Sequence, residues 1–428
     1  ATTKPGTWIK ESNGKWWYKH TDGTYTKNDW EYINGYWYHF DASGYMQTGW
    51  LKVDGKWYHL NSEGKMHIGW VKIGNYWYHF DSNGVRQTGW QKLNGNWYYF
   101  NSDGIRQVGW QQVDGKWYHL DSNGIMETGW VKIGNYWYHF DSTGVRQTGW
   151  QQLNGNWYYF NSDGIRQVGW QQVDGKWYHL NSEGIMETGW VKIGTDWYFF
   201  HSTGERYVGW LPENGKTYHF NSSGIMDIGW KKINGYWYHF NSSGVMNTTT
   251  LTEGTRKYYF HNSAGVLYCT ELIVNEEKQD KDNWCWAACA VMVGTYNTNY
   301  TSSQKAVVGA THFNSEEDTP EVDRVVVKGM NFASHDTKSG IITPPLSFNE
   351  AVAQIDKNHP FMIHLSPLDG STGHMVVCAG YSKNNGNEFV RIVDPDPTMS
   401  TLYYGYKSLC NINLEYNKYR VCTSMIIY

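Results

Sequence analysis

The first two thirds of the chain repeat one pattern of aromatic and polar positions every 20 residues. A Gly-Trp pair recurs in this register from residue 49 to residue 230, and a Trp-Tyr pair follows each of these tryptophans by seven residues, with Thr217-Tyr218 as the only loss. In one unit, residues 69–73 (GWVKI) and 76–80 (YWYHF) have the composition of strands, and residues 74–75 (GN) are turn formers. Two short strands joined by a two-residue turn of this kind predict a β-hairpin.

The hairpins are expected to stack. A single hairpin is marginally stable in water, so such units must bury their aromatic faces against one another. We therefore expect residues 1–269 to form a β-solenoid of stacked β-hairpins. Residues 71–130 and 131–190 differ at only four positions. Duplication of three units at once favours a superhelix with about three hairpins per turn.

Composition separates this array from the rest of the chain and excludes several classes of partner. Of the 26 Trp residues, 24 precede residue 270. The 36 Lys and Arg nearly balance the 40 Asp and Glu, which excludes the basic footprint of a nucleic-acid-binding protein. No stretch approaches the ~18 consecutive apolar residues that span a membrane. The polar start fits the processed form of a secreted protein, because a cleaved signal peptide would leave such a start.

The six cysteines are too few for a disulfide scaffold, and all lie at or after residue 269. The repeats are therefore not held together by disulfide bridges. No CxxC or Cys/His cluster indicates a metal, and we expect neither metal nor cofactor. The spacing leaves open whether Cys410 and Cys422 form a bridge.

The repeat consensus GWxKxxGxWYxFxxxGxMxTGW resembles the choline-binding type of cell-wall-binding repeat in Gram-positive surface proteins. The resemblance implies aromatic cages between hairpins that hold a quaternary ammonium, usually the choline of teichoic acids. A cation over Trp and Tyr faces gains ~0.5–2 kcal/mol. Each implied cage joins the Gly-Trp tryptophan, the Trp seven residues later and the Tyr of the following hairpin. Four such sets are Trp50, Trp57 and Tyr78; Trp70, Trp77 and Tyr98; Trp110, Trp117 and Tyr138; and Trp170, Trp177 and Tyr198.

One position departs from the repeat family. Two residues after the inter-hairpin Gly the family often has Met, and this chain has Met at six of these positions and Arg at five. The Met residues are Met46, Met66, Met126, Met186, Met226 and Met246, and the Arg residues are Arg86, Arg106, Arg146, Arg166 and Arg206. A guanidinium beside a cage would repel a trimethylammonium, so several interfaces are expected to be empty or to bind another ligand. Cell-wall polysaccharide is the competing ligand, and any single aromatic residue can serve packing alone.

From residue 270 the period disappears, and residues 270–428 are predicted to form one α+β domain. Residues 279–293 (QDKDNWCWAACAVMV) begin polar and become an Ala-rich apolar run typical of a buried helix. This places Cys285 at a helix N-terminus, where the partial positive charge favours the reactive thiolate.

A histidine and a carboxylate are predicted to complete the site. Residues 373–380 (GHMVVCAG) predict a buried strand with His374 at its start, where the side chain can reach a cleft. Residues 391–395 (RIVDP) predict a second strand that ends in Asp394. A nucleophile, a base and a group that orients the base form a catalytic triad. Asp396 is the alternative carboxylate.

Together these residues resemble the papain-like cysteine peptidases, and GHxVxxxG followed by VxDP resembles their compact bacterial branch. The family has Cys-Trp at the head of its central helix and an oxyanion-hole Gln six residues before the Cys, which corresponds here to Gln279. The resemblance implies that Cys285 is the nucleophile and His374 the acid and base, with Asp394 as the orienting group. Gln279 and the Cys285 backbone N–H would stabilise the oxyanion. Asp394 replaces the usual Asn, and only 89 residues separate the Cys from the His, so plant-papain substrate preferences do not transfer.

The sequence therefore predicts a secreted cysteine peptidase, attached to the cell surface through choline-bearing teichoic acid or wall polysaccharide, that acts on a peptide or protein substrate. Two alternatives stay open: a papain-fold deamidase or peptidoglycan amidase, and a catalytically inactive surface adhesin. Cys289 and Cys378 are interpreted as buried packing residues. His359 and His364 lack the flanking strand pattern and are assigned no role.

Overall fold

The computed structural model describes residues 2–298, 301–311, 323–334, 339–342, 346–367, 373–384, 386–399, 402–405 and 419–427. The chain divides into two compact units. One consists of Ala1–Gly189 and Phe200–Arg206, and the other of Trp190–Phe199 and Tyr207–Tyr428.

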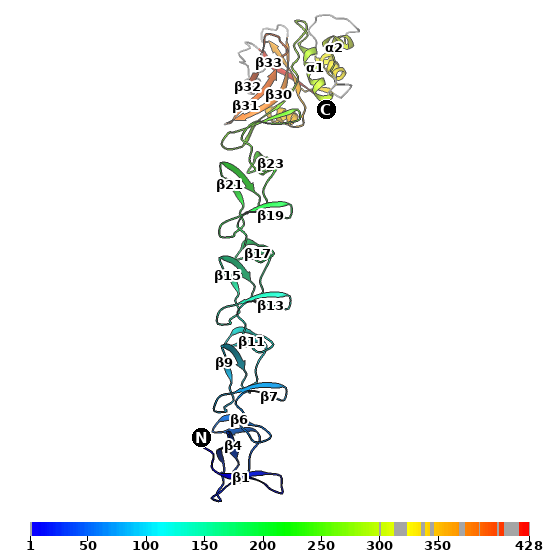
Figure 1. Ribbon diagram of the computed structural model, residues 1–428. Helices are drawn as coiled ribbons and strands as arrows, with labels where there is room; N and C mark the ends of the chain where they lie inside the picture. Colours follow the sequence, from blue (N-terminus) through cyan, green and yellow to red (C-terminus); the bar gives the residue numbers. More distant parts are fainter. Residues whose placement is uncertain are drawn as a thin grey trace. The chain divides into compact units, whose positions relative to one another are not determined.

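Up to residue 240 the chain is a series of two-stranded sheets, each formed by two consecutive five-residue strands (Figure 1). The strand pairs are β1–β2 (Gly6–Lys10, Trp16–His20), β3–β4 (Asp29–Ile33, Tyr36–Phe40), β5–β6 (Gly49–Val53, Lys56–Leu60), β7–β8 (Gly69–Ile73, Tyr76–Phe80), β9–β10 (Gly89–Leu93, Asn96–Phe100), β11–β12 (Gly109–Val113, Lys116–Leu120), β13–β14 (Gly129–Ile133, Tyr136–Phe140), β15–β16 (Gly149–Leu153, Asn156–Phe160), β17–β18 (Gly169–Val173, Lys176–Leu180), β19–β20 (Gly189–Ile193, Asp196–Phe200), β21–β22 (Gly209–Glu213, Lys216–Phe220) and β23–β24 (Gly229–Ile233, Tyr236–Phe240).

The predicted hairpins are confirmed. In β9–β10 the antiparallel register ends at Leu93 opposite Asn96, which leaves a two-residue turn. Asn94 and Gly95 in this turn have φ values of 49° and 86°. Two consecutive positive φ values are the signature of the turn whose twist matches that of the strands. Turn chemistry in the sequence therefore fixes the hairpin register.

A second turn links each hairpin to the next. The Asp81 side chain accepts hydrogen bonds from the backbone N–H groups of Asn83 and Val85, both at 2.9 Å. Gly84 closes this turn with φ 78°, and a Cβ atom there would lie 2.3 Å from the Met66 sulfur. Glycine is required by both the positive φ and the close approach. The glycine of this turn thus packs directly against the Met or Arg side chain that lies 18 residues earlier in the chain.

Backbone hydrogen bonds and a buried ring connect successive hairpins within the first unit. The Arg86 N–H donates to the Trp57 carbonyl at 2.8 Å, and the Met126 N–H donates to the Trp97 carbonyl at 2.8 Å. The last residue of the second strand in each hairpin, such as Phe80 or Phe100, is fully buried. These Phe and Leu side chains form the core of the array, while most tryptophans keep one partly exposed face.

The second unit also contains a nine-stranded sheet that begins in the last repeat. Its order is β25-β26-β27-β30-β29-β33-β28, and β31 pairs with both β30 and β32. The strands are β25 (Leu251–Glu253), β26 (Arg256–Phe260), β27 (Leu267–Leu272), β28 (Ser339–Ile342), β29 (Phe361–Pro367), β30 (His374–Asn384), β31 (Asn387–Val393), β32 (Leu402–Gly405) and β33 (Tyr419–Ile427). The sheet therefore runs without a break from the last repeat into the C-terminal segment.

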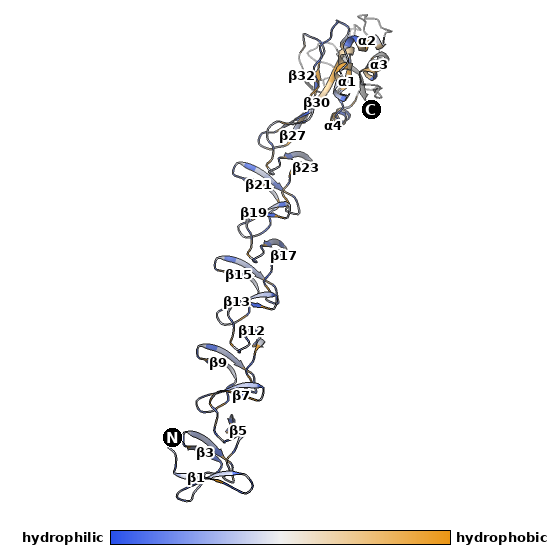
Figure 2. Cartoon of the chain, turned by 45° about the vertical axis from the view of Figure 1, so that its right-hand side comes forward, coloured by the Kyte–Doolittle hydropathy of each residue, from blue (hydrophilic) through white to orange (hydrophobic). Residues whose placement is uncertain are grey.

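The described part of the C-terminal segment has four helices: α1 (Cys285–Thr298), α2 (Gln304–Thr311), α3 (Asp323–Ala333) and α4 (Phe348–Asp356). Residues 285–294 of α1 are all buried, and Figure 2 shows hydrophobic residues concentrated in α1 and β30. A Cβ atom on Gly294 would lie 2.4 Å from the Ala333 carbonyl oxygen, so glycine lets α1 and α3 approach closely. The α1 helix is thus the central helix of this core.

Candidate functional sites

A cysteine, a histidine and a carboxylate from three elements meet at the end of α1. Cys285 is the first residue of α1, His374 is the first residue of β30, and Asp394 directly follows β31. The pairing of β31 with β30 brings Asp394 to His374, and α1 packs against β30. His374 Nε2 lies 2.8 Å from Asp394 Oδ1, and the imidazole also hydrogen-bonds the Cys285 side chain.

The pKa of His374 is raised although its imidazole is mostly buried. The His374 side chain is 16% exposed and that of Asp394 is 3% exposed. Burial by itself would lower the pKa of His374, but its hydrogen bonds and charge interactions with Asp394 and Cys285 outweigh burial and raise the pKa to about 10. The site therefore favours an imidazolium ion beside the sulfur, which is the partner that a thiolate needs.

The two candidate carboxylates have different partners. Asp394 Oδ1 accepts the hydrogen bond of the Asp396 N–H at 2.9 Å as well as contacting His374. Asp396 turns its own carboxylate to Thr398, accepting from the backbone N–H at 2.8 Å and from the hydroxyl at 2.7 Å. Asp396 therefore stabilises the loop, and Asp394 is the carboxylate at the imidazole.

Lys278, which the sequence did not indicate, holds the loop that carries Asp394. Its Nζ donates to the carbonyl oxygens of Asp394 at 3.0 Å, Asp396 at 3.1 Å and Met399 at 2.8 Å. An ammonium has three N–H donors, and here it shares them among these three carbonyl oxygens and a carboxylate. Glu276 lies 2.8 Å from the same nitrogen.

Gln304 on α2 fixes the segment before α1 in turn. This side chain is 1% exposed. Its Oε1 accepts from the Asp280 N–H at 2.8 Å, and its Nε2 donates to the Lys278 carbonyl at 2.6 Å. A buried amide whose donor and acceptor are both bonded rigidifies the backbone segment that it bonds. No local pattern marks Lys278 or Gln304, because the backbone groups that their side chains bond lie 24 or more residues away in the chain.

Gln279 lies within this fixed segment. Its backbone N–H donates to the Pro395 carbonyl at 2.8 Å, which joins it to the Asp394 loop. Its Nε2 donates to the Asp282 carbonyl at 2.8 Å. A primary amide has two N–H groups, so this bond leaves a second donor on Gln279 for another acceptor.

Three other cysteines lack the features of a reactive thiol. Burial raises the pKa of Cys269 and of Cys378 to about 12, and it raises the pKa of Cys289 well above its usual value. The Cys410 residue and the Cys422 side chain lie outside the described residues. Among the residues that are described, no group of three His, Cys, Asp or Glu side chains could hold a metal ion, and no helix is long and apolar enough to cross a membrane.

The structure brings together the rings of the predicted aromatic cages. In the first set the Trp50 ring centroid lies 6.3 Å from that of Trp57 and 4.9 Å from that of Tyr78. The other described contacts are Trp70 with Trp77 at 6.4 Å and with Tyr98 at 4.8 Å, Trp110 with Trp117 at 6.2 Å and with Tyr138 at 5.0 Å, and Trp170 with Trp177 at 6.2 Å. Tyr198 lies on β20, in the other compact unit.

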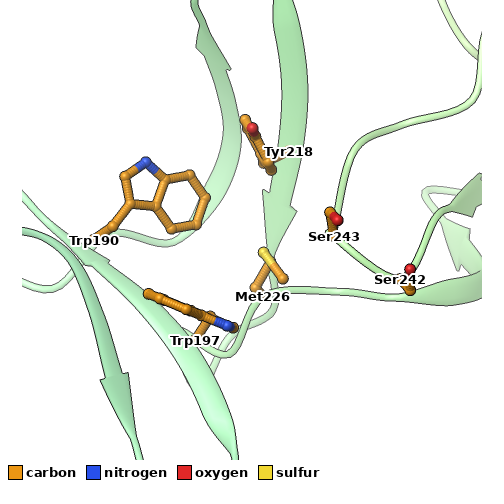
Figure 3. A pocket seen from close by; sticks show the side chains of 6 residues that line it. All are labelled: Trp190, Trp197, Tyr218, Met226, Ser242 and Ser243. Carbon is orange, nitrogen blue, oxygen red and sulfur yellow. The ribbon is translucent and has the colours of Figure 1, made fainter.

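A cage that the sequence did not single out encloses a cavity of about 350 Å³. Trp190, Trp197 and Tyr218 form three sides of this cavity, and Met226 forms a fourth (Figure 3). The Trp190 ring lies 6.4 Å from Trp197 at an interplanar angle of 77°. Ser242 and Ser243 complete the lining (Figure 3).

The last cage borders the C-terminal segment. The Trp230 ring lies 6.5 Å from Trp237 and 4.5 Å from Tyr258. These rings line a cavity of about 290 Å³ together with Asp356 at the end of α4 and Tyr381 on β30. Tyr381 donates its hydroxyl hydrogen to Asp356 at 3.0 Å.

Comparison with known proteins agrees with both parts of this description. A choline-binding repeat family matches residues 26–68, 67–105, 87–126, 107–145, 167–210 and 228–270, and a putative cell wall binding repeat matches residues 148–165 and 208–226. The Peptidase_C39 like family matches residues 271–423. No curated protein matches the chain.

Solved structures similar to part of the chain include choline-binding proteins. CbpJ from Streptococcus pneumoniae TIGR4 is 32% identical, covers 56% of this chain and 100% of its own, and has a TM-score of 0.45. Choline binding protein F from Streptococcus pneumoniae is 28% identical, covers 62% of this chain and 99% of its own, and has a TM-score of 0.42. From the family matches, the chain consists of N-terminal choline-binding repeats fused to a C-terminal Peptidase_C39-like domain.

Proposed function

We propose that the chain is a secreted cysteine peptidase that its repeats attach to the surface of a Gram-positive cell. The observation that carries the catalytic part is the hydrogen bonding of His374 to both Cys285 and Asp394. We place the catalytic domain at residues 270–428 and the attachment array at residues 1–269.

In the proposed reaction the Cys285 thiolate attacks the carbonyl carbon of a peptide bond and forms a C–S bond. Since Asp394 holds Nε2 of His374, Nδ1 is the ring nitrogen left for the sulfur and the substrate. The imidazolium gives its proton to the departing amine as the C–N bond breaks. Water then attacks the thioester with His374 as base, and cleavage of the C–S bond returns the thiolate.

The oxyanion that forms in both steps needs donors at the head of α1. We assign this role to the second N–H of the Gln279 amide and to the Cys285 backbone N–H. The backbone bond from Gln279 to Pro395 and the side-chain bond to Asp282 support the assignment, because the first holds the residue to the Asp394 loop and the second holds its amide to the turn before α1. Loss of one such donor typically costs roughly 2.7–4 kcal/mol of transition-state stabilisation.

We further propose a papain-like fold for the C-terminal domain and a β-solenoid for the repeats. The first rests on the division of the site between a central helix with the cysteine and a sheet with the histidine and the carboxylate. The second rests on the hydrogen bonds and buried rings that link successive hairpins.

For the repeats we propose choline, carried by teichoic acid, as the ligand rather than wall polysaccharide. The Trp190, Trp197 and Tyr218 rings meet at steep angles, with 77° and 66° between the planes. Three steeply inclined faces surround a round cation, whereas a sugar ring needs a flat platform. The cation gains favourable interaction with each face.

The peptidase proposal is tested with a peptide library whose products are identified by mass spectrometry. The wild type should cleave backbone bonds and be labelled by a thiol-directed epoxide, and the Cys285→Ala variant should do neither. Cys289→Ala is the matched control, one helical turn away, and should retain both. Release of ammonia without backbone cleavage would indicate a deamidase, and unchanged turnover in Cys285→Ala without labelling of the wild type would indicate an adhesin.

The ligand proposal is tested by retention on a choline resin and by the melting temperature of the full chain. Choline should retard the protein and raise its melting temperature, because a ligand that binds only the folded state stabilises that state. No effect of choline at tens of millimolar, together with retention by wall polysaccharide, would overturn choline in favour of the glycan.

A further inference from the structure

Five interfaces between hairpins have an arginine where the others have a methionine. The Arg86 guanidinium carbon lies 5.7 Å from the Trp50 ring centroid and 5.5 Å from that of Trp57. The same contacts are made by Arg106 with Trp77 at 5.8 Å, Arg146 with Trp110 at 5.8 Å and Trp117 at 5.6 Å, Arg166 with Trp137 at 6.0 Å, and Arg206 with Trp177 at 5.9 Å. A guanidinium within about 6 Å of a ring centroid makes a cation–π interaction.

The guanidinium also reaches the opposite wall of the cage. Arg86 donates an Nη2 hydrogen to the Ser102 carbonyl at 3.1 Å, and Arg146 makes the same bond to Ser162. Ser102 and Ser162 hold the position in their repeats that Ser242 holds in the cage of Met226, where Ser242 lines the cavity. The arginine therefore crosses the space that remains open beside Met226.

The arginine chain is held in this position along its length. A Cβ atom on Gly104 would lie 2.5 Å from the Arg86 Cδ, and one on Gly164 would lie 2.5 Å from the Arg146 Cδ. The methylene groups thus pack against the turn of the next hairpin, as the Met66 side chain packs against Gly84. Only the end of the side chain differs: methionine ends in a thioether, whereas arginine places a guanidinium cation in the cage.

We propose that these five arginines are built-in ligands that close their own cages, so that choline binds at the methionine-lined cages alone. The inference deepens the proposed ligand and rests on it. An internal guanidinium satisfies the aromatic faces without the entropy loss of capturing a free cation, and its charge excludes a second one. An arginine therefore stabilises its interface between hairpins, whereas a methionine leaves its cage open to bind choline.

The order of these residues spaces the open cages. In the first unit the methionines at 66, 126 and 186 are each separated by two arginines. One cage in three is then open, at intervals of 60 residues. A superhelix with about three hairpins per turn would present these open cages on one side.

The experiment counts choline molecules bound at saturation by the full chain, using equilibrium dialysis. Replacing all five arginines by methionine should raise the stoichiometry about twofold, because five cages join the four methionine cages, at Met66, Met126, Met186 and Met226, that have both tryptophans in the register of Trp190 and Trp197. Arg86→Met should add one site, and the reciprocal Met126→Arg should remove one. Circular dichroism and the melting temperature without ligand verify that each variant is folded.

The outcomes separate the two proposals. Equal stoichiometry in the wild type, Arg86→Met and Met126→Arg would overturn the closure of cages by arginine while leaving choline as the ligand. Absence of choline binding in all four proteins would overturn the ligand itself, and this inference with it. Neither outcome bears on the peptidase site, which is assayed separately.

Discussion

Burial and hydrogen bonding act on His374 in opposite directions. Burial favours the neutral imidazole, whereas Asp394 and Cys285 favour the charged one and raise the pKa to about 10. The folded-state pKa thus lies above the usual value of about 6.5. The resulting stabilisation is full below pH ~6.5 and is lost as the pH rises through about 10.

We therefore predict a pH-dependent cost of Asp394→Asn, which removes the negative charge with little change of shape. The free energy of unfolding should fall by a few kcal/mol at pH 6, at about 1.4 kcal/mol for each unit of pKa difference, and the deficit should shrink toward pH 10.5. Chemical denaturation of both proteins across this range measures it. A deficit that stays constant with pH would contradict the charge-based explanation.

Lys278 holds the Asp394 loop through three carbonyl oxygens without contacting the imidazole. We predict that Lys278→Met lowers kcat roughly 10–100-fold, since small displacements of catalytic groups have effects of this size. KM should stay nearly constant, and Lys278→Arg should recover part of the loss. Steady-state kinetics with a cleavable peptide measures both constants.

Lys383→Met is the control for that substitution. Lys383 is 60% exposed and pairs with Glu388 at the surface, where an ion pair contributes little. Its kinetic constants should match the wild type. An equal loss of kcat in the Lys278 and Lys383 variants would refute a positioning role for Lys278.

At the scale of the hairpin, two kinds of glycine have the same backbone angle and different surroundings. Gly104 and Gly115 both have φ 76°, but only Gly104 has the neighbouring Arg86 side chain against it. Alanine at either position should cost about 1–2 kcal/mol for its left-handed conformation. Gly104→Ala should cost a further ~1–3 kcal/mol for overpacking.

The comparison is completed by a double-mutant cycle on the free energy of unfolding. Adding Arg86→Ala to Gly104→Ala should recover the extra cost, whereas adding it to Gly115→Ala should recover none, because those two residues are not in contact. Equal costs for the two glycine variants would show that the turn adjusts to the clash.

Some elements follow from local sequence, and others do not. Most hairpins are predictable because their strands and their two-residue turn, which is Asn-Gly, Asp-Gly or a pair that begins with Gly such as Gly74-Asn75, lie within 12 residues, and the structure confirms them. The capping box at α4, with Ser347 and Glu350 bonded reciprocally, is also a local signal. The bulge in the pairing of β30 with β31, between Cys378 and Gly380, has no local signature.

For the whole molecule, the internal duplication predicts a viable deletion. Removal of residues 71–130 joins two nearly identical sequence contexts and deletes three hairpins with two arginine cages and one methionine cage. We predict unchanged peptidase kinetics, unchanged cooperative unfolding, and loss of one bound choline. Retention on a choline surface should fall, since multivalent binding weakens with each lost site.

A matched deletion of residues 91–110 removes one hairpin and one arginine, Arg106, but no methionine cage. Its choline stoichiometry should equal that of the full chain. A loss of three bound choline molecules on deletion of residues 71–130 would instead show that every interface binds, whatever residue lines it.

The sequence by itself determined what depends on near neighbours and strict periodicity: the hairpins, their cages of rings, and the start of a buried helix at Cys285. It also indicated His374 and Asp394, because strand patterns and the family resemblance marked both. The sequence also showed whether each cage has Met or Arg. It led us to expect that arginine would repel a cation, but it did not show that the guanidinium lies over the rings.

The tertiary structure alone decided which groups support the site. Lys278 reaches a loop more than 100 residues away, and Gln304 fixes the segment before α1 from another helix. The pKa of His374 likewise depends on burial and on two partners from other elements. Such properties arise from contacts between distant segments, and a linear pattern does not encode them because hydrogen bonds and dielectric surroundings exist only once the chain has folded.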